Sequence, residues 1–187
     1  SASGKGTVAL RVAQALGFDY LDSGALYRLT ALYAEKRGVS WHNEEAVAQL
    51  AGNLPVRFEE AQIMLNDEDV SAQIRSEAIG MGASAIAQLS KVRAALLQRQ
   101  RDFLTEKGLV ADGRDMGSVV FPDAVLKVFL TASAQVRAQR RARQLGLPCE
   151  GVEFDRILSD IEARDEADRR RPVAPLRQLP DAVLLDT

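Results

Sequence analysis

The residues with the clearest chemical pattern stand at the start of the sequence. A Gly-Lys-Gly-Thr run closes a segment that matches the second half of the phosphate-binding pattern GxxxxGK, and its members are Ser1, Ala2, Ser3, Gly4, Lys5, Gly6 and Thr7. In such a loop the glycines let backbone N–H groups surround phosphate oxygens, the lysine reaches the β and γ phosphates, and the hydroxyl helps to hold Mg²⁺. We therefore expect an anionic nucleotide as ligand, although a loose glycine-rich terminus can have the same composition.

Two further polar groups directly follow short apolar runs. The first group follows residues 18–21 and consists of Asp22, Ser23, Gly24, Tyr27 and Arg28. The second group follows residues 109–111 and consists of Asp112, Gly113, Arg114 and Asp115. If both runs are parallel strands, their carboxyl ends meet at one edge of a sheet, where α/β proteins bind ligands. A helix cap at Ser23 or an Asp-Gly turn would explain either group alone. Both groups together, in a chain that opens with GKGT, favour a binding site.

The charged residues point to a small anion as the partner. The formal net charge is only −2, so a broad nucleic-acid surface is not expected. Arginine nevertheless supplies 19 of the 24 basic residues, with clusters at Arg137, Arg140, Arg141 and Arg143 and at Arg164, Arg169, Arg170 and Arg171. The planar guanidinium fork meets phosphate bidentately, which suits a small polyanion. For any single arginine, a solvated helix face is the alternative.

The rare residue types exclude several kinds of catalysis. His42 is the one histidine and Cys149 the one cysteine, which leaves no disulfide framework, Cys/His zinc site or Ser-His or Cys-His nucleophile. Catalysis must then use Arg, Lys, Asp, Ser and backbone dipoles. No apolar run approaches the roughly 20 residues that cross a bilayer, and 187 residues fit one domain.

Helices and strands alternate along most of the chain. Apolar residues at helical spacing predict a helix after the Gly-Lys turn up to Gly17, and others near residues 26–37, 43–50, 76–87, 90–106 and 154–169. A further helix is expected after Ser133, and it carries the first arginine cluster. Strands are predicted at residues 18–21, 109–111, 125–130 and 182–185, and helix caps at Asn43, Ser90 and Ser133. The pattern of residues 52–76 predicts a small antiparallel sheet inserted in the α/β chain. The pattern indicates an α/β fold with a parallel sheet covered on both faces.

Six segments, taken in order, resemble bacterial cytidylate kinases. They are SASGKGT (1–7), YLDSGALYR (20–28), DVSAQIR (69–75), VRAALLQRQR (92–101), ADGRDMGSVVFPDA (111–124) and RDEADRRRPVAPL (164–176). The resemblance implies a three-layer P-loop NTPase fold that forms a single kinase domain, with its core at 1–51 and 87–187, an insert that binds the nucleoside monophosphate at about 52–86, and a lid at about 140–153. It also implies transfer of the γ phosphate of ATP, with Mg²⁺, to CMP or dCMP.

The resemblance assigns roles one position at a time. Residues 1–7 would hold the ATP phosphates. On the acceptor side it implies phosphate contacts for Ser23, Arg28 and Arg114, cytosine contacts for Ser84, Arg93 and Asp115, ribose contacts for Arg164 and Asp168, and a further contact for Arg171. The implied catalytic set is Lys5, Arg114, Arg140, Arg141 and Arg171, in which Arg140 and Arg141 are lid arginines. Thr7 and Asp112 are the Mg²⁺ candidates, with a turn-forming carboxylate as the alternative for Asp112.

This chemistry also follows from the residue types. Phosphoryl transfer proceeds mainly by positioning and charge stabilisation, so a chain with one histidine can perform it. A carboxylate such as Asp115 can accept the exocyclic amino group of cytosine, while an arginine such as Arg93 can serve the ring acceptors.

Other functions remain open at this stage. A kinase for UMP, AMP or a non-nucleotide acceptor would keep GKGT and the lid arginines, and a non-catalytic nucleotide-binding module is a second alternative. A structural protein is the weakest, because it leaves the strand-end groups unexplained. We expect a cytoplasmic monomer with small nucleotides, and neither nucleic acid nor membrane, as partners.

The opening motif carries one more expectation. The strand before a phosphate-binding loop is central in this kind of sheet, and the sequence starts inside the loop. Residues 109–111 and 182–185 would then lack the strand between them, which leaves backbone groups unpaired. We expect a longer native chain, with about ten more residues at the N-terminus and a helix after Thr187.

Overall fold

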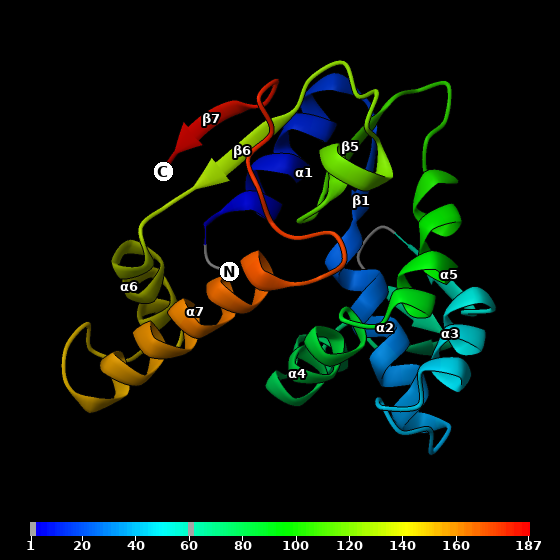
Figure 1. Ribbon diagram of the computed structural model, residues 1–187, viewed down its shortest axis with the longest axis horizontal. Coiled ribbons are helices and arrows are strands. Elements are labelled where there is room, and N and C mark those ends of the chain that lie inside the picture. Colours follow the sequence, from blue (N-terminus) through cyan, green and yellow to red (C-terminus); the bar gives the residue numbers. More distant parts are fainter. Residues whose placement is uncertain (1–2, 60–61) are drawn as a thin grey trace. The chain divides into compact units, whose positions relative to one another are not determined.

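The computed structural model describes residues 3–59 and 62–187 (Figure 1). The chain separates into two units, Gly17–Gly113 and Ser1–Leu16 with Arg114–Thr187, and each is described by itself. No helix in the described part of the chain is long and apolar enough to cross a membrane.

The first unit is built around two parallel strands. Strand β1 (Asp19–Asp22) pairs with β5 (Leu109–Asp112), in a register that sets Leu21 beside Ala111 and Asp22 beside Asp112. The polar residues that follow the two strands therefore start at the same edge of this sheet. The sequence prediction for this pair of strand ends is confirmed.

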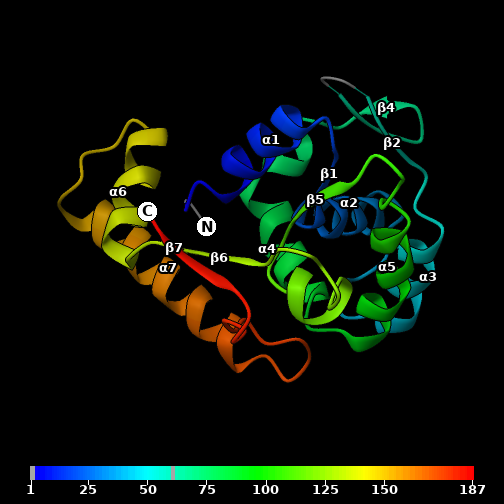
Figure 2. The same ribbon diagram turned by 90° about the horizontal axis from the view of Figure 1, so that it is seen from above.

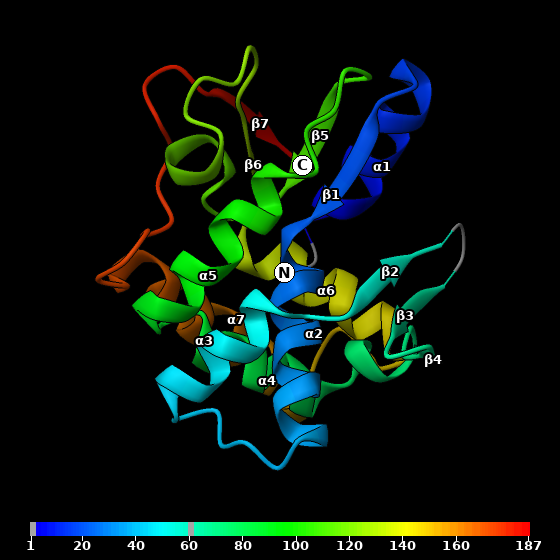
Figure 3. The ribbon, with the colours of Figure 1, turned by 90° about the vertical axis from the view of Figure 1, so that its right-hand side faces the viewer.

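Four helices pack around one another in this unit (Figure 3). They are α2 (Ser23–Lys36), α3 (Glu44–Gly52), α4 (Glu77–Ile86) and α5 (Ser90–Arg101), and α2 is buried along most of its length. Asn43 caps α3 through the N–H of Ala46, as predicted. The predicted cap at Ser90 is wrong, because Leu89 takes the cap position and the Ser90 hydroxyl donates instead to Glu44 Oε1 at 3.2 Å. Helix α5 also ends at Arg101, short of the predicted residue 106.

The predicted antiparallel sheet is present in the same unit. Strands β2 (Val56–Phe58), β3 (Ile63–Leu65) and β4 (Glu68–Asp69) form a three-stranded sheet (Figure 3). Asn66 and Asp67 turn between β3 and β4 with φ of 49° and 63°, a conformation that Asn and Asp tolerate better than most residues. A short 3₁₀ turn, η1 (Gln73–Arg75), connects the sheet to α4, whose first turn is capped by Ser76.

The second unit contains the other parallel strand pair and three helices (Figures 1 and 2). Helix α1 (Lys5–Leu16) follows the Gly-Lys turn, and β6 (Val128–Thr131) pairs with β7 (Val183–Asp186). A single π-helical turn, η2 (Met116–Val120), was not predicted from the sequence. Helices α6 (Ala134–Gln144) and α7 (Val152–Arg170) lie side by side around a core of Ala138, Ala142, Phe154 and Ile161.

The parallel strands form two separate pairs in the described residues. Strand β5 pairs with β1 in the first unit, and β7 pairs with β6 in the second. That a further strand lies between β5 and β7 stays a prediction.

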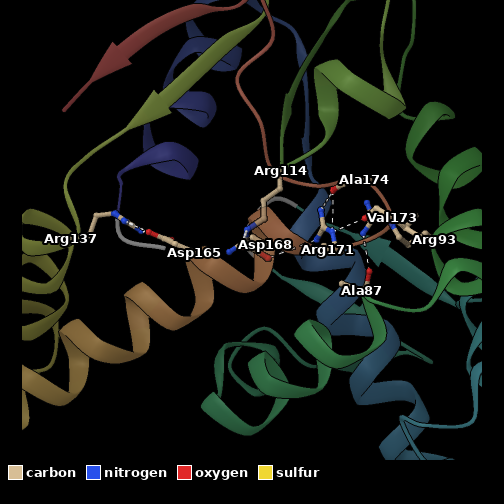
Figure 4. Close-up of polar contacts among 9 residues, drawn as sticks. All are labelled: Ala87, Arg93, Arg114, Arg137, Asp165, Asp168, Arg171, Val173 and Ala174. Atoms are coloured by element: carbon tan, nitrogen blue, oxygen red, sulfur yellow. Dashed lines mark hydrogen bonds and ion pairs between the residues drawn. The ribbon is translucent and has the colours of Figure 1, made fainter.

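A buried ion pair joins α6 to α7 (Figure 4). Arg137, only 9% exposed, donates from Nη1 to Asp165 Oδ1 at 2.9 Å and from Nη2 to Oδ2, while its Nε donates to the Ala132 carbonyl at 2.9 Å. Such a two-pronged contact fixes both side chains. Burial by itself would raise the pKa of the Asp165 carboxyl, but the hydrogen bonds and charge of Arg137, together with weaker effects of other positive charges such as Arg169, hold that pKa below its usual value.

A depressed carboxyl pKa predicts the direction of a pH effect on stability. The charged pair stabilises the fold above the unfolded pKa of about 4, and this stabilisation is lost as the pH falls through the lower folded pKa. We expect the difference in free energy of unfolding between wild type and Asp165→Asn to be constant above about pH 5 and to shrink below about pH 4. Denaturant titrations from about pH 3 to 7 measure it.

The matched control is Asp160→Asn, which changes an exposed carboxylate of the same helix. It should leave the unfolding free energy nearly unchanged over this range. An Asp165→Asn difference that does not vary with pH would contradict a charge-dependent role for the pair.

Candidate functional site

The phosphate-loop residues lead directly into helix α1. Lys5, Gly6 and Thr7 are its first three residues, so their backbone N–H groups lie at the positive end of the helix dipole. Gly4 has a φ of 82°, which glycine adopts without strain, and it turns the chain into the helix. Ser1 and Ala2 lie outside the described residues. The described part of the loop has the local geometry that suits an anion at a helix N-terminus.

One of the two predicted lid arginines reaches the loop. Arg140 of α6 donates from Nη1 to the Ser3 carbonyl at 3.3 Å and to Thr187 Oγ1 at 3.0 Å. Thr187 Oγ1 in turn lies 3.2 Å from the Ser3 carbonyl. Arg141, the next residue, is exposed on the same helix. The structure thus brings Arg140 into contact with Ser3, a described residue of the phosphate loop.

The strand ends in the first unit hold two aspartates. Asp22 caps α2 by accepting the N–H of Ala25 at 3.1 Å, which makes Asp22, rather than Ser23, the cap of this helix. Asp112 is buried at the end of β5, and the Tyr20 hydroxyl donates to its Oδ2 at 3.3 Å. Burial, the negative charges of Asp112 and Asp22, and this hydrogen bond raise the pKa of Tyr20 far above its usual range. Tyr20 therefore stays protonated and remains a donor to Asp112.

Ser23 makes a buried contact that the sequence did not reveal. Its hydroxyl lies 2.6 Å from Gln100 Oε1, and both residues are at most 3% exposed. The Gln100 amide donates from Nε2 to the Leu96 carbonyl at 3.2 Å, which fixes its orientation and makes Oε1 an acceptor. A serine hydroxyl has a single proton, so Ser23 gives that proton to Gln100 here. In this structure Ser23 links the start of α2 to α5.

Arg28 extends from α2 to the segment that follows the antiparallel sheet. It donates to the carbonyls of Ile74 and Ser76 at 2.8 and 3.4 Å. Gly80 of α4 leaves room for this side chain, since a Cβ there would lie 3.1–3.4 Å from the guanidinium atoms. The guanidinium is thereby held against η1 and α4.

Arg93 is held from two directions. It donates from Nη1 to the Ala87 carbonyl at 3.1 Å (Figure 4), and its Cζ lies 5.5 Å from the ring centre of Tyr27. Ser84, the other residue with an expected base contact in this unit, is exposed on α4. Both residues belong to the same unit as Ser23 and Arg28.

The second unit brings two arginines to one carboxylate (Figure 4). Arg114 Nε lies 2.5 Å from Asp168 Oδ2, and Arg171 Nη1 lies 3.8 Å from Asp168 Oδ1. Arg171 is buried and also donates to the carbonyls of Val173 and Ala174, at 2.8 and 3.0 Å from its Nε. Ala174 adopts a φ of 49°, an unusual value for alanine, at the turn around this guanidinium. Asp168 is the counter-charge that lets two cations share one cluster.

Two more predicted residues belong to this unit. Asp115 is buried at 6% exposure, directly before the π-helical turn η2. Arg164 lies on α7 one helical turn before Asp168, so the two residues share a face of that helix. The family resemblance implies ribose contacts for both Arg164 and Asp168.

The sequence analysis missed Gln100, Tyr20 and the Arg137–Asp165 pair. The spacing of the sequence could have indicated Gln100. It follows Val92 and Leu96 at intervals of four on the buried stripe of α5, where a polar residue needs a hydrogen-bond partner. The other two have no comparable local signal, since Tyr20 and Asp112 are 92 positions apart in the sequence.

The features of both units suit one type of chemistry. A helix that starts at a Gly-Lys turn can bind phosphate, and fixed guanidinium groups can stabilise the charge of a phosphoryl group in transfer. Together with the parallel strands and the antiparallel insert, these residues define an α/β protein of the P-loop kinase class.

Comparison with known proteins narrows this class. The family model described as cytidylate kinase matches residues 1–187. The chain is 74% identical to a cytidylate kinase of Neisseria meningitidis serogroup A and 60% identical to one of Chromobacterium violaceum, over all of this chain and 85% and 84% of those proteins. A cytidylate kinase of Pseudomonas putida is 55% identical, again over the whole chain and 85% of the relative. The chain belongs to the cytidylate kinase family.

The buried Ser23–Gln100 contact predicts a stability effect. Ser23→Ala leaves Gln100 Oε1 buried without its donor, so we expect the free energy of unfolding to fall by about 1–3 kcal/mol. Ser159→Ala, an exposed serine-to-alanine change in α7, is the control and should change it by less than about 0.5 kcal/mol. Denaturant titrations measure both variants, and equal stability of the two would contradict the contact.

Proposed function

We propose that this chain transfers the γ phosphate of ATP to CMP or dCMP, with CDP or dCDP and ADP as products. The observation that carries the proposal is the Arg114–Asp168–Arg171 cluster, in which one carboxylate pairs with two guanidinium groups. Membership of the cytidylate kinase family supports the same reaction and the same nucleotides.

The reaction needs positioned positive charge more than a base. Charge in the transition state is spread over the oxygens of the transferring phosphoryl group, and fixed cations stabilise it without reorganising. Lys5, Arg114, Arg140, Arg141 and Arg171 are the proposed catalytic residues. Arg140 has the best support among the lid arginines, because it contacts the Ser3 carbonyl of the phosphate loop.

The donor nucleotide is proposed to bind at residues 1–7. The backbone N–H groups at the start of α1 and the Lys5 ammonium would meet its phosphates. Mg²⁺ fits this chemistry, because it prefers oxygen ligands, and Thr7 offers a hydroxyl while buried Asp112 offers a carboxylate oriented by Tyr20. When bound, the ion would neutralise phosphate charge. The described residues contain no group of three or more His, Cys, Asp or Glu side chains that could hold a metal ion.

The contacts of the acceptor nucleotide are proposed residue by residue, from membership of the family. Arg28, Arg114 and Arg171 would bind its phosphate, together with the start of α2 at Ser23. Because the Ser23 proton is donated to Gln100, a phosphate contact by that hydroxyl requires the proton to change partner. Arg164 and Asp168 are the proposed ribose contacts, with Asp168 also holding the two arginines.

The base would be read by complementary donors and acceptors. Cytosine presents an exocyclic amino group, which the Asp115 carboxylate can accept, and a ring nitrogen and carbonyl, which the Arg93 guanidinium can serve. Ser84 is the third proposed base contact. Uracil has a carbonyl in place of the amino group, so the same set rejects it. A monomeric state and a cytoplasmic location are further proposals.

A panel of nucleoside monophosphates tests the reaction. ADP release from ATP and Mg²⁺ is measured with CMP, dCMP, UMP, AMP and no acceptor. We expect release to depend on CMP or dCMP. Equal or greater release with UMP or AMP would indicate another acceptor, and ATP binding without release would indicate a non-catalytic module.

The proposed role of Asp115 predicts that its replacement weakens the discrimination between CMP and UMP. Asp115→Ala removes the acceptor for the cytosine amino group, so we expect the ratio of kcat/KM for CMP to that for UMP to fall by about tenfold to a hundredfold. Arg28→Ala and Arg114→Ala should instead lower kcat/KM for both nucleotides, because both carry the same phosphate. Steady-state kinetics with the two acceptors measure the ratio.

The control for this change is Asp123→Ala, an exposed aspartate in the loop after η2. It should keep the wild-type ratio. An Asp115→Ala enzyme that still discriminates CMP from UMP as wild type does would defeat the assignment of Asp115.

A further inference from the structure

Tyr27 is a buried aromatic residue among the acceptor-side residues of the first unit. It lies on α2 directly before Arg28 and is 8% exposed. The Cζ of Arg93, on α5, lies 5.5 Å from its ring centre, within the range of cation–π attraction. None of the nucleotide contacts proposed above uses Tyr27.

The ring complements the other restraint on Arg93. The Ala87 carbonyl, at the C-terminal end of α4, accepts from Nη1 at 3.1 Å. Cation–π attraction acts on the charge as a whole and requires none of the N–H donors, so a guanidinium held by a ring can still donate to a base. Residues from α2, α4 and α5 thus fix one side chain.

We propose that Tyr27 is a positioning residue, which holds the Arg93 guanidinium so that it can distinguish cytosine from uracil. This rests on the base-reading role proposed for Arg93. Arginine has donors and no acceptor, and N3 is an acceptor in cytosine but carries a hydrogen in uracil. A guanidinium held opposite N3 therefore favours cytosine, and a guanidinium that moves between rotamers discriminates less.

The test compares two substitutions at Tyr27. Tyr27→Phe keeps the ring face, while Tyr27→Leu removes it and retains an apolar side chain. We expect Tyr27→Leu to lower the CMP-to-UMP ratio of kcat/KM by about twofold to thirtyfold relative to wild type. Tyr27→Phe, which keeps the ring, should stay close to the wild-type ratio. Both nucleotides are assayed on one preparation, so a partly unfolded sample changes both rates equally and leaves the ratio intact.

The chain offers a matched control on the same helix. Tyr33 lies six residues further along α2, and the Cζ of Arg37 is 5.9 Å from its ring centre. Tyr33→Leu removes a similar aromatic–arginine contact away from the proposed base-reading residues. It should keep the wild-type CMP-to-UMP ratio, even if it lowers stability.

The Arg93→Ala background separates the two proposals. Arg93→Ala should lower the ratio, and adding Tyr27→Leu to it should lower the ratio no further, because Tyr27 acts through Arg93. Suppose that Arg93→Ala lowers the ratio. The positioning role is then wrong if Tyr27→Leu alone leaves the ratio unchanged, or if Tyr27→Leu lowers it further in the Arg93→Ala background. In both cases the base-reading role of Arg93 stands. If Arg93→Ala keeps the wild-type ratio, the base-reading role is wrong and the positioning role falls with it.

Discussion

The ion pairs of Asp168 are the interaction on which the second unit depends most. Arg114 and Arg171 carry like charges, and without a counter-charge their repulsion would drive them apart. The Asp168 carboxylate contacts both, from Oδ2 at 2.5 Å and Oδ1 at 3.8 Å. Because Arg171 is buried and further fixed by two backbone carbonyls, its guanidinium has little freedom. An anion can then meet charges that are already oriented.

The same principle recurs at the other arginines. Arg28 is held by two carbonyls, Arg93 by a carbonyl and a ring, and Arg140 by the phosphate-loop carbonyl of Ser3. A free arginine loses much side-chain entropy when it binds a ligand, and these contacts remove part of that loss beforehand. Electrostatic catalysis gains in the same way, because fixed charges need no reorganisation during the reaction.

Local features of the fold could be predicted from the sequence, and long-range features could not. The strands themselves, the antiparallel sheet and the caps at Asn43 and Ser133 follow from patterns of a few residues. The Ser90 cap failed because Glu44, 46 positions away, accepts the backbone N–H of Lys91 at the start of α5 as well as the Ser90 hydroxyl. The contact between Ser23 and Gln100 spans 77 positions, and no local pattern could pair the two residues. For the candidate site, the sequence indicated the residue types but not which partner holds each arginine.

Kinetics of Asp168→Asn with both CMP and dCMP test the central claim most directly. The substitution keeps the shape of the side chain and removes its charge. If Asp168 organises the arginine cluster, kcat/KM should fall roughly tenfold or more for both nucleotides, since both present the same phosphate. A contact with the ribose 2′-hydroxyl alone would lower only the value for CMP. Unchanged phosphorylation of dCMP by Asp168→Asn would therefore contradict the account.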